Sequence, residues 1–174
     1  MTSDAVPAVP LSPSREPFDP TDVTWTPVSR RLVGARLTVA AIVLVPVLAV
    51  LVLVAVLAGE TWVWAFPAAV LLLGLWIAWL VPRQVGAMAY AERADDLLVR
   101  HGIMFRSLVV VPYGRMQYVD VNAGPLGRRF GIATVQLHTA APATSAAISG
   151  LPPHEAARLR DRMASRGEAR LAGL

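Results

Sequence analysis

A short polar segment, residues 115–121, carries the side chains best suited to molecular recognition. We predict a β-strand here, in which Arg115 and Gln117 share one face and Asp120 takes the other. A guanidinium on such a strand binds a carboxylate or phosphate, and a side-chain amide hydrogen-bonds a partner's backbone. The alternative is internal: Arg115 pairs with Asp95 or with Asp120 of a neighbouring subunit, and Gln117 completes the hydrogen bonds between strands. The sequence leaves both open, although the internal role is the commoner one for such residues.

Two further groups of arginines suggest contacts with charged partners. Arg128 and Arg129 follow a turn-rich segment, and anionic lipid headgroups are one partner for them; a solvated loop is the equal alternative. Arg158, Arg162 and Arg166 repeat at a spacing of four and form a stripe along a predicted helix. Such a stripe is more often a solvated helix face than a binding site, so we assign it no ligand.

The sequence offers no arrangement suited to catalysis or metal binding. The chain contains no cysteine, which excludes disulfides, thiolate nucleophiles and thiolate metal sites. His101, His138 and His154 fall at a turn, in a strand and at the start of a helix, and their spacing is not that of a metal-ligand pair. No Gly-rich loop follows a strand and opens a helix. We therefore predict that the protein is not an enzyme and has no metal or cofactor.

Two long apolar segments determine where these residues act. Residues 37–58 and residues 62–81 are runs of 22 and 20 residues without a charge, separated by Gly59, Glu60 and Thr61. A helix of about 20 apolar residues crosses a hydrocarbon core of roughly 30 Å. The break between the runs is long enough only for a tight turn. We therefore predict two transmembrane helices that form a hairpin.

The arginines predict the orientation of this hairpin. Arg30, Arg31 and Arg36 precede the first span and Arg83 follows the second, whereas the loop between the spans carries only Glu60. Positive residues remain on the cytoplasmic side. We expect a multi-pass protein of the cell membrane with both termini in the cytoplasm. The predicted anchors at the membrane interfaces are Trp25, Trp62, Trp64, Trp76 and Trp79.

The rest of the chain divides into segments that differ in composition and in the spacing of their apolar residues. Residues 1–24 are rich in Pro, Ser, Asp and Thr, which is typical of a disordered tail, and residues 25–36 form a juxtamembrane segment. Residues 86–167 form a domain with strand-like runs between turn signals, and residues 168–174 form a C-terminal tail. The candidate strands are residues 86–93, 97–101, 103–111, 115–121, 134–139 and 145–148.

The order of these elements predicts a fold. The clearest strand, residues 134–139, alternates polar and apolar side chains. The last element is a helix that ends near Gly167 and needs a packing partner, because its apolar stripe is narrow. That stripe consists of Ala156, Leu159 and Met163. We predict a membrane-anchored α+β protein: a two-helix transmembrane hairpin followed by a pleckstrin-homology-like antiparallel barrel or sandwich capped by a C-terminal helix.

Several sequence strings resemble those of YdbS-like bacterial pleckstrin-homology (PH) membrane proteins. They are DDLLVRHG at residues 95–102, VPYGRMQYVDV at 111–121, GPLGRRFGIATV at 124–135 and ISGL at 148–151. The resemblance covers roughly residues 25–166, and the second string is its most specific part. Departures are small: Met116 stands where the family usually has Ile or Val, and Gly114 where a small polar residue is common. The resemblance implies a membrane-tethered domain with no established enzyme activity.

Three functions remain possible. We expect a binding or scaffolding module at the inner leaflet that engages another membrane protein or a second copy of itself. The resemblance also suggests a component of a transport or export system, acting in resistance to membrane-active peptides. Anionic-lipid sensing is the third, although the basic residues near the first hairpin are too few to predict a specific inositol-lipid site. Neither nucleic acid nor a small-molecule substrate is expected, because no motif for either is present.

Overall fold

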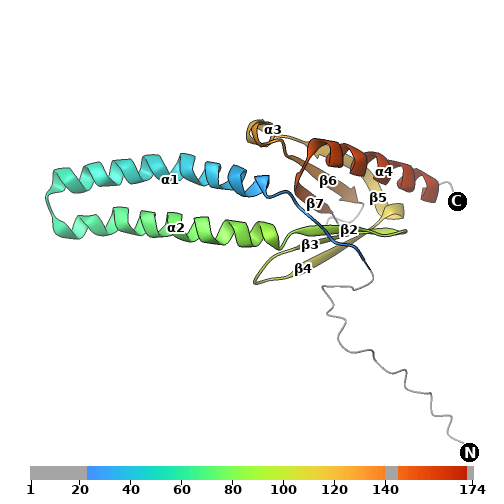
Figure 1. Cartoon of the computed structure of the whole chain (residues 1–174), viewed down its shortest axis with the longest axis horizontal. Coiled ribbons are helices and arrows are strands. Elements are labelled where there is room, and N and C mark those ends of the chain that lie inside the picture. The colour runs from blue at the N-terminus through green and yellow to red at the C-terminus, as the bar shows by residue number, and fades with distance from the viewer. Residues whose placement is uncertain (1–22, 140–144, 172–174) are drawn as a thin grey trace, which may run out of the picture.

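A computed structural model describes residues 23–139 and 145–171, with side chains described as far as residue 167. Most of the predicted N-terminal tail therefore lies outside the described residues. Two parts are evident: a long helical hairpin and a β-rich domain at its base (Figure 1).

The hairpin consists of α1 (Arg31–Ala58), a short 3-10 helix η1 (Thr61–Trp64) and α2 (Ala65–Gly86). Gly59 caps the end of α1 with a φ of 70°, in the left-handed region that glycine adopts without strain. By length and composition both helices are candidate membrane spans, and most of their apolar side chains are exposed. Both helices extend beyond the apolar runs, and α2 includes Pro82, so the strand predicted from residue 86 starts only at residue 89.

The first sheet takes strands from both sides of the hairpin in the sequence. Its order is β1 (Thr26–Pro27), β2 (Ala89–Glu92), β3 (Asp96–His101) and β4 (Ser107–Pro112). Strand β1 is antiparallel to β2, with Thr26 opposite Tyr90. The hairpin is therefore an insertion between the first two strands of the sheet, because β1 precedes α1 and β2 follows α2.

The second sheet has three antiparallel strands, and its register shifts once in each of its two pairings. Its order is β5 (Met116–Asn122), β6 (Ala133–Thr139) and β7 (Ala146–Leu151). The predicted alternation in β6 is confirmed: Val135 and Leu137 are buried and Gln136 is half-buried. A short helix, α3 (Pro125–Phe130), joins β5 to β6 where the sequence suggested a loop. The two sheets are separate, so the domain is a sandwich and not a closed barrel.

Helix α4 (Pro153–Leu171) packs against β5, β6 and the turn η2 (Tyr113–Arg115). The predicted apolar stripe is confirmed, since Ala156, Leu159 and Met163 are fully buried. The predicted end at Gly167 was wrong, because the helix continues to Leu171. A glycine inside a helix costs only about 1 kcal/mol relative to alanine, which packing against the domain outweighs.

The feet of the hairpin belong to the core of the domain. Leu32 and Val85, one from each membrane helix, are buried in the same cluster as the sheet residues. The amide of Ser29 donates a 2.9 Å hydrogen bond to the carbonyl of Gly150. Gly150 has a φ of 84°, and a Cβ there would lie 2.9 Å from the Cβ of Leu32. The hairpin is therefore docked on the sandwich and is not joined to it by a loose linker.

The tip between β3 and β4 differs from the prediction. A strand was expected over residues 103–111, yet β4 begins only at Ser107. Gly102 has a φ of 96°, and a Cβ there would lie 1.9 Å from the carbonyl oxygen of Phe105, so glycine closes this turn. Met104 and Phe105 are 86% and 85% exposed. Their apolar character suggested a strand, although the described part of the domain leaves them exposed.

Candidate functional site

Strand β5 is an edge of the second sheet, and a groove runs between it and α4. An edge strand carries backbone groups that a further strand can pair with. The groove has a volume of about 320 Å³. It is lined from β5 by Met116, Gln117, Tyr118 and Val119, and from α4 by Arg160, Met163, Ala164 and Gly167.

The structure separates the three residues predicted for recognition. Arg115 is exposed in η2, just before the strand, and forms no ion pair with Asp95 or any other described residue. Gln117 is exposed and lines the groove. Asp120 is exposed farther along β5, where it accepts a 2.9 Å hydrogen bond from the side chain of Asn122. The groove therefore contains Gln117 and neither of the other two.

A bulge explains why simple alternation was a poor guide in β5. The pairing with β6 shifts between Met116 and Tyr118, so Gln117 has no paired residue opposite it. From Tyr118 onward the strand resumes alternation, with Tyr118 and Asp120 exposed. Tyr118 stacks on His138 with ring centroids 4.3 Å apart. Sequence reasoning missed Tyr118 and the α4 side of the groove, because no periodic pattern links the two elements.

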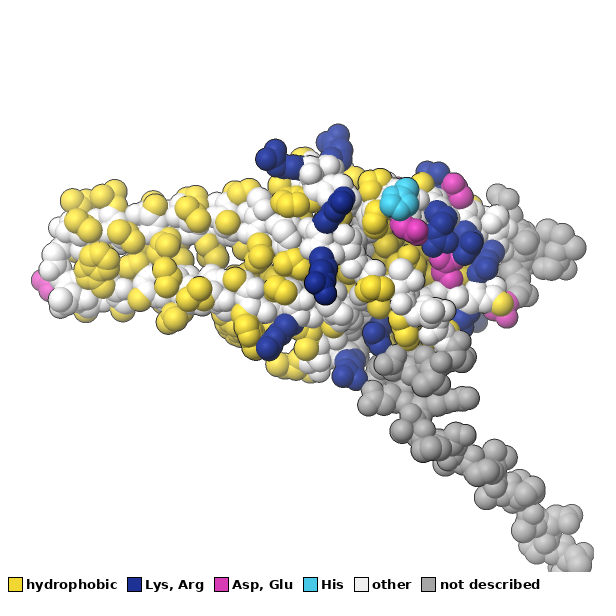
Figure 2. Space-filling view, viewed as in Figure 1, with side chains coloured by type: hydrophobic (Ala, Val, Ile, Leu, Met, Phe, Trp, Pro, Cys, Tyr) yellow, Lys and Arg dark blue, Asp and Glu magenta, His cyan; other side chains and the backbone are white. Residues whose placement is uncertain are grey.

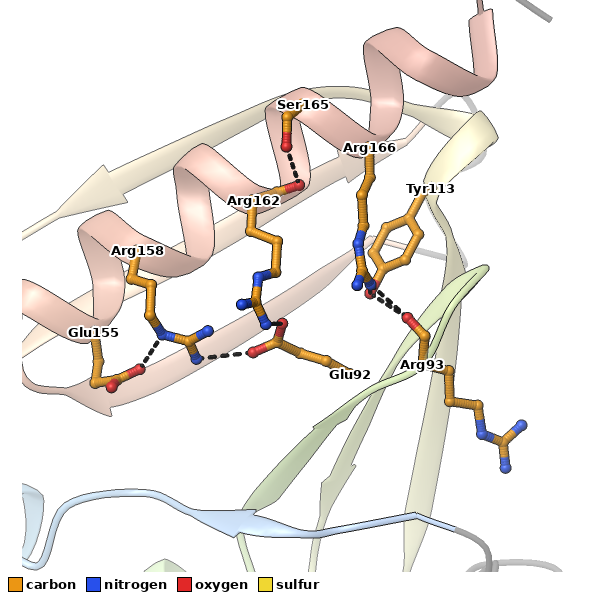
Figure 3. A network of polar contacts seen from close by, with 8 residues as sticks. All are labelled: Glu92, Arg93, Tyr113, Glu155, Arg158, Arg162, Ser165 and Arg166. Carbon is orange, nitrogen blue, oxygen red and sulfur yellow. Dashed lines mark hydrogen bonds and ion pairs between the residues drawn. The ribbon is translucent and has the colours of Figure 1, made fainter. Parts of the chain in front are cut away.

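The α4 arginines, Arg158, Arg162 and Arg166, face the domain. Glu92 on β2 accepts 2.8 Å hydrogen bonds from both Arg158 and Arg162 (Figure 3). The Glu92 side chain is only 14% exposed. Burial raises the pKa of Glu92, but the hydrogen bonds from the two arginines outweigh burial and lower that pKa below its ordinary value. Glu155 also bonds Arg158, and these carboxylates raise the pKa of Arg158.

Arg166 completes the contact between α4 and the first sheet. Its guanidinium donates to the carbonyl oxygen of Arg93 and lies 3.1 Å from the hydroxyl of Tyr113 (Figure 3). Tyr113 is buried, and burial raises the pKa of its hydroxyl despite the nearby guanidinium. Arg158 and Arg162 are 40% and 47% exposed, as expected of a solvated helix face. The sequence did not predict their ion pairs, because it could not reveal that Glu92 lies opposite them.

A second group of arginines surrounds the base of the hairpin, and we call them the basal arginines. They are Arg30, Arg31, Arg36, Arg83, Arg128 and Arg129. None of them forms a salt bridge within the part of the chain that the structure describes. Figure 2 shows a band of basic side chains where the apolar hairpin meets the domain.

Helix α3 brings two of the basal arginines to this band. The helix packs against α1, and a Cβ at Gly34 would lie 3.0 Å from the ring of Phe130. Arg128 and Arg129 are both exposed. They therefore lie on a helix docked at the foot of the hairpin, which is the position that headgroup contact requires.

The tryptophans predicted as membrane anchors occupy two settings. Trp62 and Trp64 at the turn of the hairpin, and Trp76 and Trp79 in α2, are between 48% and 66% exposed. Their role as membrane anchors stays a prediction. The guanidinium of Arg83 lies 3.5 Å from the ring centroid of Trp79. Trp25 instead packs on the domain, where the guanidinium of Arg100 lies 4.6 Å from its ring centroid.

Among the described residues, no group of three acidic or histidine side chains is placed to hold a metal ion.

Comparison with known proteins agrees with this architecture. The sequence profile of the bacterial PH domain family matches residues 28–167. The transmembrane protein YdbS of Bacillus subtilis (strain 168) is 33% identical over 128 residues, which cover 72% of this chain and 79% of that protein. The resemblance recognised in the sequence is thereby confirmed. No solved structure matches the chain.

Proposed function

This chain belongs to the bacterial PH domain family, and on that premise we propose that it is a membrane-tethered binding module whose β5–α4 groove holds an extended segment of another membrane protein. The proposal is for binding and not for catalysis. The observation that carries it is the groove beside the open edge of β5.

The chemistry of the groove favours an extended peptide. Addition of a strand to a sheet edge obtains affinity from main-chain hydrogen bonds and specificity from side-chain pockets. The edge of β5 offers the main-chain groups, and Gln117, which stands at the bulge, lines the groove. Met163 and Ala164 supply apolar wall, while Arg160 lies at the groove with its charge paired to Asp161.

The proposed location is the cytoplasmic side of the cell membrane. The basal arginines lie at the foot of the hairpin, and Glu60 is the only charged residue at its turn. Positive residues remain cytoplasmic, which supports placing the domain and both termini on that side. The C-terminal half of α4, which lines the groove, lies away from the hairpin (Figure 1), so a partner in the same membrane needs a cytoplasmic segment that extends to that end of the domain.

The test is co-purification of the tagged full-length chain from its native membrane in mild detergent. Ala164→Trp fills the groove from an exposed helix position, whereas Ser165→Trp adds the same bulk beside it without lining the groove. We expect one integral membrane protein in stoichiometric amount that is retained by Ser165→Trp and lost by Ala164→Trp. A tag on that protein should recover the chain.

Gln117→Ala provides a milder version of the same test. Loss of one side-chain hydrogen bond at an interface weakens binding by about 1 kcal/mol, or roughly fivefold. An identical set of partners in the wild-type chain and in Ala164→Trp would reject the groove as the binding site.

A further inference from the structure

We propose that the space between the β3–β4 tip and the foot of α2 is a binding site for one anionic phospholipid of the surrounding leaflet. The tip inserts beside that lipid at the depth of the headgroups. The inference rests on a different surface from the β5–α4 groove and does not depend on a protein partner.

The first observation is the exposure of the tip. Ile103, Met104 and Phe105 are three consecutive apolar residues, 42%, 86% and 85% exposed. Isolated apolar side chains on a surface need no explanation, but a contiguous exposed apolar patch marks a contact with a membrane or a protein. The tip lies at the end of the domain that bears the hairpin (Figure 1). A lipid surface is therefore the environment nearest to it.

The second observation is a groove that connects the tip to the hairpin. It has a volume of about 440 Å³, within the range of about 300–1,000 Å³ typical of ligand sites. Its walls come from α1, α2 and the β3–β4 tip, three elements that meet only in the folded chain. Among the residues that line it are Leu80, Gln84 and His101. Apolar side chains thus face polar ones, as an amphiphilic ligand requires.

The third observation is an unneutralised charge. Arg36 lines the groove, and no acidic residue does. Its guanidinium forms no hydrogen bond to an oxygen of any described residue; its nearest polar contact is the sulfur of Met88 at 4.0 Å. A half-buried guanidinium is stabilised by a carboxylate or a phosphate. The phosphate of an anionic lipid meets this requirement, and its acyl chains can lie against Leu80 and Ile103.

The fourth observation is the position of the groove along the hairpin, which sets its level relative to the lipid headgroups. Leu80 and Gln84 flank the position where Trp79 and Arg83 stack. Tryptophan and arginine concentrate at the level of lipid headgroups. The groove therefore opens where headgroups are, so the ligand is a lipid of the leaflet and not a soluble anion.

The first experiment measures lipid retention by the full-length chain in mild detergent, using native mass spectrometry. The probes are dioleoylphosphatidylglycerol and dioleoylphosphatidylcholine. We expect one phosphatidylglycerol to be retained in preference, and Arg36→Gln to weaken its retention about fivefold. The matched control is Arg83→Gln, which removes the same charge from the base of the hairpin without lining the groove.

Three results would overturn the site. The first is equal retention of the two lipids, and the second is an equal loss of phosphatidylglycerol retention in Arg36→Gln and Arg83→Gln. The third is displacement of the lipid by excess inorganic phosphate. Ala164→Trp, which blocks the β5–α4 groove, should leave lipid retention unchanged. Failure of the protein-binding proposal and failure of the lipid site are therefore separable.

The second experiment locates the tip directly. The chain has no cysteine, so Met104→Cys gives a single labelling site for an environment-sensitive fluorophore. In nanodiscs that contain phosphatidylglycerol, we expect blue-shifted emission and quenching by spin-labelled lipids at position 104. Ala94→Cys, in the exposed turn between β2 and β3, should instead be quenched by aqueous iodide. Equal access of iodide to both positions would show that the tip does not insert.

Discussion

The α4 arginines and the basal arginines are the same kind of residue in two different electrostatic settings. Arg158 and Arg162 share the carboxylate of Glu92, and Arg166 is held by a carbonyl and a tyrosine hydroxyl. The basal arginines have no acidic partner within the described residues. The α4 group therefore stabilises the domain, while the basal group keeps its charge available for an external anion.

The difference shows that net charge alone says little about binding. The chain has a formal charge of +4, and every basic residue is an arginine. Partner geometry decides which guanidinium groups are neutralised inside the molecule. Four predictions test the distinction, because the α4 group should affect the stability of the domain and the basal group should not.

Removal of the shared carboxylate should have the largest effect. Glu92→Gln removes the negative charge and replaces one of the two oxygens that accept from Arg158 and Arg162 with an NH2 donor. We expect the free energy of unfolding to fall by about 2 kcal/mol. The arginine side chains are 40% and 47% exposed. The loss therefore stays below the roughly 3–5 kcal/mol that removal of one partner costs in a fully buried ion pair. Denaturant unfolding in mild detergent measures it. Glu155→Gln, which removes one contact of Arg158, is the control, and its free energy of unfolding should fall clearly less.

The same carboxylate should make the stability of the domain depend on pH. The pKa of Glu92 in the folded protein lies below its ordinary value of 4.5. Its contribution is therefore complete above that value and is lost as the pH falls through the folded-state pKa. We expect unfolding measured from pH 7 to pH 3 to show a steeper acid loss in the wild-type chain than in Glu92→Gln. Parallel curves would mean that Glu92 is not the group responsible.

Arg166→Lys should have an intermediate effect. A lysine cannot span the Arg93 carbonyl and the Tyr113 hydroxyl with the planar geometry of a guanidinium. We expect a loss of about 1 kcal/mol in the free energy of unfolding. An unchanged stability would show that the buried ring of Tyr113, and not its hydroxyl contact, fixes this end of α4.

Substitution of the basal arginines should have the smallest effect on stability. Arg128→Gln with Arg129→Gln should change the free energy of unfolding in detergent by less than about 0.5 kcal/mol, because both side chains are exposed and neither forms a salt bridge with a described residue. The same double variant should retain less phosphatidylglycerol from mixed micelles. A large loss of stability in detergent would remove the distinction between the two groups.

Much of the architecture follows from local patterns. The two uncharged runs in residues 37–81 predict the hairpin, and alternation predicts which face of β6 is buried. The stripe of Ala156, Leu159 and Met163 predicts the buried face of α4. Each of these features depends on residues close together in the chain, whose period is set by the geometry of a helix or a strand.

The candidate sites were less predictable for the opposite reason. Gln117 was identified as a recognition residue, but the bulge at its position and the wall that α4 forms opposite depend on contacts between distant parts of the chain. Met104 and Phe105 were assigned to a strand because an exposed apolar tip and a buried strand have the same composition. Only the tight turn at Gly102 shows that these residues form a tip and not a strand.

The sequence by itself determined the two candidate membrane spans, the buried faces of β6 and α4 and the family, because these depend on composition and on the spacing of residues close together in the chain. Tertiary structure decided that β1 joins the sheet across the inserted hairpin and that Glu92 lies opposite two arginines of α4. It also decided that Arg36 faces a groove without an acid. The physical reason is that neutralisation of a charge depends on distance in space, and Glu92 is separated from Arg162 by 70 residues of chain.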